Sequence, residues 1–575
     1  MARKTLLAAL LSAPLAFSAM ADDVVLKRFT AGTGLNAVGL VQGGEDTELA
    51  GPQAIYAGDD GKLFLLDQVN GRILSFDPKK PQAAAKALQL PGNVQPTDLV
   101  VRQDGIFVWD GEVRALRAKG RDDDAPTRGL EEFQTRAAED EFTLGMFAQM
   151  GSQKLGSADE LLEESTRALP KPRTPLPVKQ SLLTRGGGPV VASIATDKSG
   201  SLADIQVRGQ GSTEAFAKLR LKVSDRLGAV EFLDIDKKGR MFVLAENIPT
   251  DTADSAAAFV ARFSPMGALE GIFELPLSES AAVSRRAVTV SEEGEVYFLR
   301  TRQTAVDVLG VGFRPLRNAK VIDVHGTRRA GGSPSLSARG ARAAVRPLTR
   351  AEVIRTAFMF ERARWRVTPS LYGPDPDRTC TGFRRVRRPG YLHGKLGQEV
   401  RGIPYCWGCH GSLQQISNAF ARGALAGNVC TRDEPRRDVA GVDCSAFVSA
   451  AWGLASHFTT IAIPSITKVV SNPWDMLPGD AFNKPGSHVM LFLRFTPDRK
   501  VEVMEASPGA CNGRVCRNVY PLSSLLARGY TPVRFRALTE DMTARVDVPS
   551  EEVEKPAAKP RRENQSRRSN HRRRR

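Results

Sequence analysis

The sequence predicts a multidomain protein: an all-β, propeller-like N-terminal domain followed by a C-terminal domain that is built differently. Two observations lead to this prediction. Short strands that alternate with glycine turns recur up to residue 325, whereas all seven cysteines lie at or after position 380. Between these regions, residues 326–347 are dominated by Gly, Ser, Arg and Pro without an apolar period, which is typical of a flexible linker.

Residues 1–21 have the pattern of a secretory signal peptide. Two basic residues precede a short apolar run, and Ala19-Met20-Ala21 is a small-x-small cleavage pattern. No later stretch is apolar over the length that a bilayer requires. We therefore expect an exported protein, periplasmic or secreted, in a compartment where disulfides persist.

Within residues 22–325, a loose β unit returns about every 40 residues. The stretch "AIYAGDDGKLFLLDQVNGRILSFD" has a polar turn that ends at Gly61, and similar turns occur at Gly105, Gly239 and Gly294. Glycine can take the positive φ that such hairpin turns need. The spacing predicts stacked or radial β-repeats that resemble NHL-like propeller blades, with an irregular β-sandwich as the alternative. A propeller would offer a surface for a protein or glycan ligand.

Residues 119–186 interrupt these repeats. The stretches "RGLEEFQTRAAEDEFTLGMFAQM" and "SADELLEESTRAL" have a helical, charged pattern. The closely spaced prolines of "PKPRTPLPVK" disfavour helix and indicate an extended connection. We expect a helical and Pro-rich insertion between two blades.

The C-terminal residues 541–575 are expected to form a disordered basic tail. Residues 561–575 hold eight Arg and a single Glu, so a large part of the formal net charge of +17 lies there, with too few apolar residues for a core. Two interpretations stay open: a solvated extension, or weak electrostatic contact with anionic envelope polymers or a membrane surface. Because no aromatic residues are interleaved, we expect no specific nucleic-acid recognition.

In the C-terminal domain, residues 348–540, the stretch "GVDCSAFVSAAWGL" places Cys444 before apolar residues at helical spacing. A helix is therefore expected to begin near Cys444, and the partial positive charge of a helix N-terminus stabilises a thiolate. The N–H groups at that end also point toward an oxyanion formed beside the sulfur. Cys444 is therefore the candidate nucleophile.

A base for this thiol is available downstream. His488 begins the apolar run "HVMLFLRF", and Glu505 lies in the alternating stretch "KVEVMEAS", after the short connection "TPDRK". Two strands joined by so short a turn pair antiparallel, so we expect His488 and Glu505 to be cross-strand neighbours. A thiol, an imidazole and a carboxylate that orients the imidazole make up a nucleophile, its base and a positioning group.

Four motifs, "GIPYCWGC", "GVDCSAFV", "PGDAF" and "SHVMLF", occur in this order within about residues 395–535. In this they resemble the NlpC/P60 cysteine peptidases of bacterial cell walls. The resemblance implies a papain-like α+β fold that hydrolyses amide bonds in peptidoglycan stem peptides. It also implies that Cys444 is the nucleophile and His488 the general base and acid. Glu505 stands where the family commonly has a second histidine.

The resemblance implies further site residues. Tyr405 would donate its hydroxyl to the oxyanion, together with the backbone N–H of Cys444. Asp443 and Ser445 would line the pocket that holds the peptide end of the substrate.

The other six cysteines are candidates for three disulfides: Cys380, Cys406, Cys409, Cys430, Cys511 and Cys516. Cys511 and Cys516 flank the turn signal Asn512-Gly513, and the remaining pairings are open. "CWGCH" also matches a haem-attachment pattern, and Cys406, Cys409, His410 and Cys430 could be considered for zinc. Disulfides explain these cysteines more simply, so we expect neither a cofactor nor a metal.

Three functions remain in view from the sequence. The first is an exported cysteine peptidase or amidohydrolase that acts on peptidoglycan stem peptides. The second is acyl transfer or amidase chemistry on the same fold. The third is a binding or scaffold protein of the cell envelope, built on the propeller, whose peptidase-like domain is catalytically inactive.

Overall fold

The computed structural model describes residues 22–41, 49–92, 94, 96–103, 105–110, 113–119, 125–132, 177–186, 188–250, 256–282, 284–316, 319–326, 348–373, 386–430 and 438–539. These residues belong to one compact unit. The predicted signal peptide, the basic tail, and the linker apart from its first residue lie outside the described residues, as does 133–176 of the predicted insertion.

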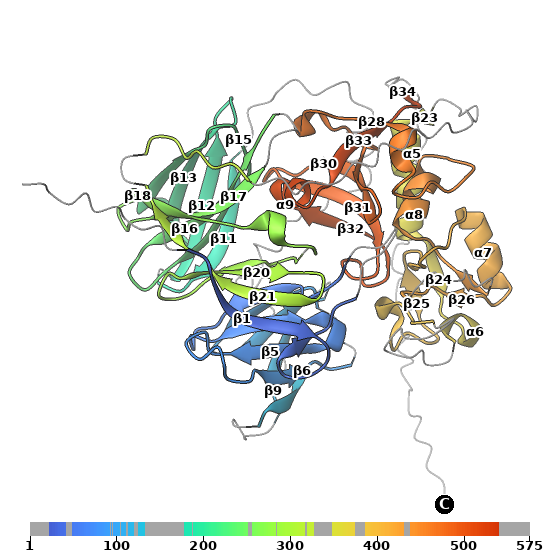
Figure 1. Ribbon diagram of the computed structural model, residues 1–575, viewed down its shortest axis with the longest axis horizontal. Coiled ribbons are helices and arrows are strands. Elements are labelled where there is room, and N and C mark those ends of the chain that lie inside the picture. The colour runs from blue at the N-terminus through green and yellow to red at the C-terminus, as the bar shows by residue number, and fades with distance from the viewer. Residues whose placement is uncertain are drawn as a thin grey trace, which may run out of the picture. The chain divides into compact units, whose positions relative to one another are not determined.

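The N-terminal part consists of strands in successive antiparallel meanders (Figure 1). Its first two sheets contain β1 (Val24–Ala31), β2 (Ala37–Val38), β3 (Ala54–Ala57), β4 (Leu63–Asp67), β5 (Arg72–Phe76), β6 (Lys86–Gln89), β7 (Asp98–Arg102), β8 (Gly105–Trp109), β9 (Val113–Ala118), β10 (Thr127–Glu132), β19 (Val288–Val290), β20 (Val296–Thr301) and β21 (Ala305–Gly310). The other two contain β11 (Val178–Thr184), β12 (Gly188–Thr196), β13 (Leu202–Gly209), β14 (Ala217–Lys222), β15 (Arg226–Ile235), β16 (Met241–Ile248), β17 (Ala257–Phe263), β18 (Leu269–Glu274) and β22 (Phe313–Pro315).

The meanders are arranged as in a propeller. Strand β3 contacts both β7 and β19, and β15 contacts both β11 and β19, so the first strands of the meanders lie next to one another. Strand β1, from the start of the chain, pairs antiparallel with β21, from the end of the domain, with Phe29 opposite Val306. This pairing joins the two ends of the domain in one sheet. The propeller-like prediction is therefore confirmed at the level of architecture, and the sandwich alternative is not.

Three of the four predicted turn glycines, Gly61, Gly239 and Gly294, have positive φ, whereas Gly105 does not and is the first residue of β8. Gly61 and Gly239 have φ of 75° in the turns that follow β3 and β15, a conformation in which a Cβ would be strained. The strands show the alternation that half-buried sheets require: in β14 the side chains are buried and exposed in turn. Local pattern and turn chemistry together account for these hairpins.

The predicted insertion at 119–186 is wrong at both edges. Strand β10 falls inside it and pairs antiparallel with β9 and parallel with β6, while β11 pairs along its whole length with β12. The charged "TRGLEE" of β10 has a helical composition, but Leu130 is 2% exposed in the sheet. The non-local pairing with β6 overrides the local preference.

The C-terminal part is built on an antiparallel sheet of six strands among the described residues, in the order β28-β33-β29-β30-β31-β32. Its strands are β28 (Thr467–Val469), β29 (Ala481–Lys484), β30 (His488–Phe495), β31 (Val501–Ser507), β32 (Arg514–Tyr520) and β33 (Thr531–Phe535). The short strands are β23 (Leu348–Thr349), β24 (Arg364–Arg366), β25 (Glu399–Arg401), β26 (Leu425–Ala426), β27 (Val439–Ala440) and β34 (Leu538–Thr539).

Helices α5 and α8 pack against each other and against this sheet: α8 contacts β30 and β31, and α5 contacts β32. The described helices of this part are α5 (Arg350–Arg362), α6 (Pro369–Tyr372), α7 (Leu413–Ala421), α8 (Cys444–Ala451) and α9 (Leu522–Ala527). Helix α5 begins with the predicted capping box, in which Thr349 and Glu352 satisfy each other's backbone N–H groups. No described helix has the length and apolar character to cross a membrane.

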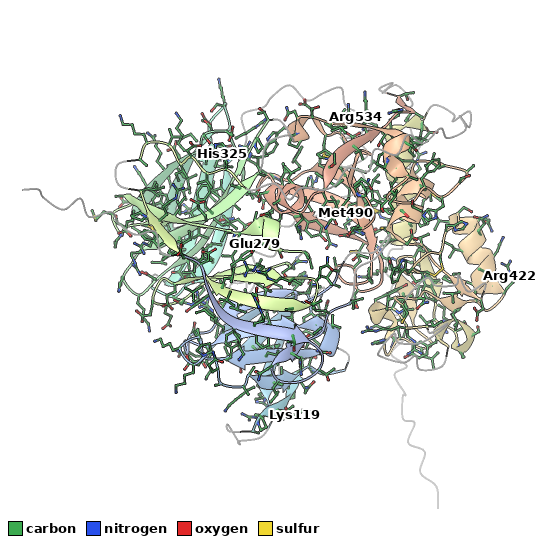
Figure 2. The ribbon with its side chains drawn as sticks, viewed as in Figure 1. Lys119, Glu279, His325, Arg422, Met490 and Arg534 are labelled. Atoms are coloured by element: carbon green, nitrogen blue, oxygen red, sulfur yellow. A yellow bond between two sulfur atoms is a disulfide. The ribbon has the colours of Figure 1, made fainter. Side chains whose placement is uncertain are left out.

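The aspartate of "PGDAF" ties helix α5 to the sheet. Asp480 is fully buried and accepts hydrogen bonds from Arg350 Nη1 at 2.9 Å and from Arg534 Nη2 at 2.8 Å. Arg534, labelled in Figure 2, lies on β33, and Arg350 is the first residue of α5. Two buried or nearly buried cations therefore share one carboxylate.

Substitution of Asp480 with Ala is expected to lower the free energy of unfolding of the C-terminal part by about 3–5 kcal/mol, because it leaves buried guanidinium groups without their carboxylate. Urea unfolding followed by tryptophan fluorescence measures this. The matched control is Glu399→Ala: Glu399 forms an exposed ion pair with Arg364 in the same part, and exposed pairs contribute about 1 kcal/mol or less. Equal effects of the two substitutions would contradict the prediction.

Candidate active site

Cys444 is the first residue of helix α8, as the sequence predicts. Its neighbour Asp443 is the N-cap: the side chain accepts a hydrogen bond from the Ala446 N–H at 2.8 Å. The thiol group therefore lies at the end of the helix where the backbone N–H groups are unsatisfied and the helix dipole is positive. Cys444 is fully buried and is not in a disulfide.

Asp443 and Ser445 hold the loop that precedes the helix. Asp443 also accepts hydrogen bonds from the Gly408 N–H at 3.1 Å and from the Ser445 hydroxyl at 2.9 Å. Both residues are fully buried. The polar atoms of both side chains are thus engaged in capping and in contacts within the protein, and their predicted role in lining a substrate pocket stays a prediction.

Tyr405 lies next to the same helix end. Its backbone forms an isolated parallel bridge with Val442, two residues before Cys444, and its N–H donates to the Gly513 carbonyl at 2.8 Å. Its side chain is buried in the core cluster that also contains Cys444.

His488 and Glu505 are brought into direct contact. His488 Nε2 and Glu505 Oε2 are 2.6 Å apart, and both side chains are 1% exposed. The ladder of β30 and β31 pairs Leu491 with Met504. Extending this register places Ser507 opposite His488, so Glu505 is its diagonal neighbour on the same face of the sheet.

Two residues that the sequence analysis did not single out complete this pair. Asn518 Nδ2 donates to Glu505 Oε1 at 2.8 Å, and the Tyr520 hydroxyl donates to the same oxygen at 2.6 Å. Both lie on β32, which pairs with β31. They are two residues apart on the strand that follows the predicted Asn512-Gly513 turn, so they lie on the same face of that strand. This spacing is the signal that could have identified them.

These contacts keep Glu505 ionised. Burial alone raises the pKa of its carboxyl, but the hydrogen bond and charge of His488, together with the donors Tyr520 and Asn518, outweigh burial and lower the pKa below the usual glutamate value. A carboxylate only accepts hydrogen bonds, so the proton between the two groups resides on His488 Nε2. The nitrogen that can exchange a proton with a thiol is then Nδ1.

The position of α8 sets the chemistry that this arrangement can perform. The helix that starts with Cys444 packs on β30, which starts with His488, and on β31, which carries Glu505. A thiol at a helix N-terminus, an imidazole and an orienting carboxylate in one buried core can generate a thiolate–imidazolium pair. These are the three kinds of group that nucleophilic attack on an acyl carbon requires.

Five of the six described cysteines are disulfide-bonded. Cys511 pairs with Cys516 across the predicted turn, Cys406 pairs with Cys409, and Cys430 is also in a disulfide. Cys380 lies outside the described residues. Because the sulfur atoms of Cys406 and Cys409 are joined to each other, the "CWGCH" segment here is a disulfide loop rather than a pair of thiol ligands.

His457 is a further polar neighbour that the sequence analysis did not assign to the site. Its Nε2 lies 2.6 Å from the Ser445 hydroxyl and 3.6 Å from Asp443 Oδ1, and its ring stacks on that of His410 at a centroid distance of 5.5 Å. The described residues contain no group of three or more His, Cys, Asp or Glu side chains that could hold a metal ion.

No family model matches the chain, and no curated protein matches it. The resemblance to NlpC/P60 peptidases therefore rests on the four motifs. Among solved structures, the chain is similar to hydrazine synthase of Kuenenia stuttgartiensis (13% identity, 44% of this chain and 78% of that chain, TM-score 0.23). It is also similar to a streptogramin B lyase (12%, 47% and 97%, TM-score 0.20) and to the aldose sugar dehydrogenase of Streptomyces coelicolor in its PQQ-bound form (10%, 50% and 98%, TM-score 0.21). TM-scores this low carry no argument about fold or function.

Proposed function

We propose that this chain is an exported cysteine amidohydrolase that cleaves amide bonds in peptidoglycan stem peptides, with an NlpC/P60-like, papain-like C-terminal domain. The observation that carries the proposal is the buried His488–Glu505 hydrogen bond on the two strands against which the Cys444 helix packs. The four motifs supply the substrate class. Export to the periplasm or the cell exterior is part of the proposal, as is a propeller that sets location or substrate access.

The proposed reaction has two halves. Cys444 Sγ, its proton passed to His488 Nδ1, attacks the carbonyl carbon of the amide, and the C–N bond then breaks as His488 returns the proton to the leaving amine. Water, deprotonated by His488, next attacks the thioester and releases a carboxylate and the Cys444 thiol. Glu505 stabilises the imidazolium in both halves, and the Cys444 N–H with the Tyr405 hydroxyl would bind the oxyanion.

Acyl transfer on the same site is the second candidate, and the burial of Cys444 favours it. The residue has no exposed surface, so surrounding side chains must shift before a substrate reaches the sulfur. A thioester formed in such a site is shielded from bulk water, which gives an amine acceptor an advantage over water.

Digestion of isolated peptidoglycan with the mature protein tests both candidates. We expect mass spectrometry to show stem peptides shortened at one amide bond, with a new carboxylate and a new amine in equal amounts. Peptides that instead gain the mass of an added amine would indicate acyl transfer. Unchanged peptidoglycan in the presence of intact protein would contradict the hydrolase proposal.

A further inference from the structure

A cavity of about 130 Å³ lies between the propeller strands and the end of the C-terminal sheet. Its walls include Asp98 and Arg286 from the propeller and Asn518 and Tyr520 from β32. The volume is comparable with cavities of roughly 150 Å³ that hold a ligand of benzene size. It is therefore large enough for a molecule of about the size of a small amino acid.

The contacts around the cavity join the two parts of the chain. The Lys500 ammonium forms an ion pair with Glu231 of β15. Glu246 of β16 accepts hydrogen bonds from the Ser523 N–H at 2.9 Å and from its hydroxyl. Lys500, Glu231 and Glu246 are all less than 10% exposed. These contacts hold α9 and the residue that precedes β31 against the propeller at the edge of the cavity.

The cavity wall carries two adjacent arginines on one side. Arg286 Nε donates to Asp98 Oδ1 at 2.8 Å. Arg285 directly precedes Arg286 in the chain and also lines the cavity. Burial lowers the pKa of Arg285 and the neighbouring Arg286 charge adds to the effect, while Asp98 and Tyr520 oppose it. A buried guanidinium is strongly stabilised by a nearby anion. A carboxylate is the best such anion, because its two oxygens match the planar geometry of the guanidinium.

The same cavity adjoins the candidate catalytic centre. Asn518 and Tyr520 line it, and both donate their hydrogen bonds to Glu505 Oε1. A carboxylate placed between Arg285 and Tyr520 offers the Tyr520 hydroxyl a second acceptor. Such an occupant would compete with Glu505 for the Tyr520 hydroxyl proton.

We propose that this cavity is a binding site for a small carboxylate of about amino-acid size, held by Arg285, and that its occupation inhibits the site at Cys444 by drawing Tyr520 away from Glu505. The proposed binding depends only on the cavity and its lining residues, and not on the proposed function. The inhibition part rests on the proposed function, since hydrolysis of an amide releases a carboxylate and would make such a molecule a product-like inhibitor.

Calorimetric titration of the full mature chain with L- and D-alanine, each against its alaninamide, tests the binding. The amides differ only by loss of the carboxylate. We expect at least one alanine enantiomer to bind at millimolar concentration and its amide at least tenfold more weakly. Arg285→Gln should weaken alanine binding at least tenfold. The control Arg220→Gln, at an exposed arginine paired with Asp204, should leave it unchanged.

Binding of neither enantiomer, or equal binding to wild type and Arg285→Gln, would overturn the site. The titration is repeated on Cys444→Ala protein, so its outcome does not depend on turnover. For the inhibition, alanine should lower peptidoglycan cleavage by the wild type but not by Arg285→Gln. Binding without any effect on cleavage would overturn the coupling, whereas binding by a chain that cleaves nothing would overturn the proposed function and leave the site standing.

Discussion

Replacing Cys444 with Ala is expected to abolish amide hydrolysis while the fold persists. Removal of the nucleophile of a hydrolase lowers kcat by roughly 10⁶-fold, as in serine proteases. The substitution removes one sulfur atom from a buried position in the core of the C-terminal part, which is a small loss of packing. Release of stem peptides from peptidoglycan, quantified by mass spectrometry, measures the effect.

Alkylation with iodoacetamide supplies an independent readout. Because Cys444 is the described cysteine outside any disulfide, wild-type protein should incorporate label there and the Cys444→Ala protein should not. Labelling should be faster at neutral pH than for an ordinary thiol if a thiolate forms. Full activity of Cys444→Ala would end the proposal, and a wild-type thiol that never labels would favour the inactive scaffold.

Replacing Glu505 with Gln is expected to lower kcat by about 10⁴-fold, the effect of the equivalent change in a serine protease triad. Three donors converge on Glu505, from His488, Asn518 and Tyr520. A glutamine side chain has only one oxygen that can accept from these donors. Its NH₂ group therefore faces at least one donor, which loses its acceptor. If that group faces His488, the imidazole takes the tautomer in which Nδ1 carries the proton and cannot accept one from the thiol.

Glu502→Gln is the matched control. Glu502 lies on the same strand, but its carboxylate pairs with Arg494 at 2.8 Å and with Arg517 rather than with His488. Its substitution should lower stability without the same loss of kcat. Near-ultraviolet circular dichroism confirms that both variants are folded. A Glu505→Gln enzyme with wild-type kcat would show that the carboxylate does not orient His488.

The pH dependence follows from the lowered pKa of Glu505. Because the folded-state pKa lies below the unfolded value, Glu505 contributes stability that is fully present above the unfolded pKa and is lost as pH falls through the folded pKa. Urea unfolding at a series of pH values below neutral should therefore show a free energy of unfolding that falls as Glu505 becomes protonated. Glu505→Gln should remove the part of the acid-induced loss of stability that wild type shows.

Local chemistry made part of the site predictable. The start of α8 at Cys444 follows from apolar residues at helical spacing, a pattern that acts within a few residues. The strands that carry His488 and Glu505 follow from alternation and a short turn, and the Cys511–Cys516 disulfide from the Asn512-Gly513 turn. Each of these features depends on contacts between residues that are near one another in the chain.

Features that depend on distant segments were missed. The local pattern predicts that β10 belongs to a helical insertion, because its partner β6 lies some forty residues earlier and no local signal marks that pairing. Asn518 and Tyr520 were overlooked because only the pairing of β32 beside β31 shows that they reach Glu505. The cavity lined by Arg285 and Tyr520 joins segments more than two hundred residues apart.

The sequence by itself determined which residues carry the candidate chemistry, that Cys444 begins a helix, and that glycine turns divide the first half of the chain into β meanders. Only the tertiary structure decided that β1 pairs with the last propeller sheet, that Asp443 serves as a buried cap, and that Tyr520 lies between the cavity and Glu505. The physical reason is the separation along the chain over which each interaction acts. Turns, caps and alternation act over a few residues, whereas strand partners and buried charge contacts are selected when the whole chain packs.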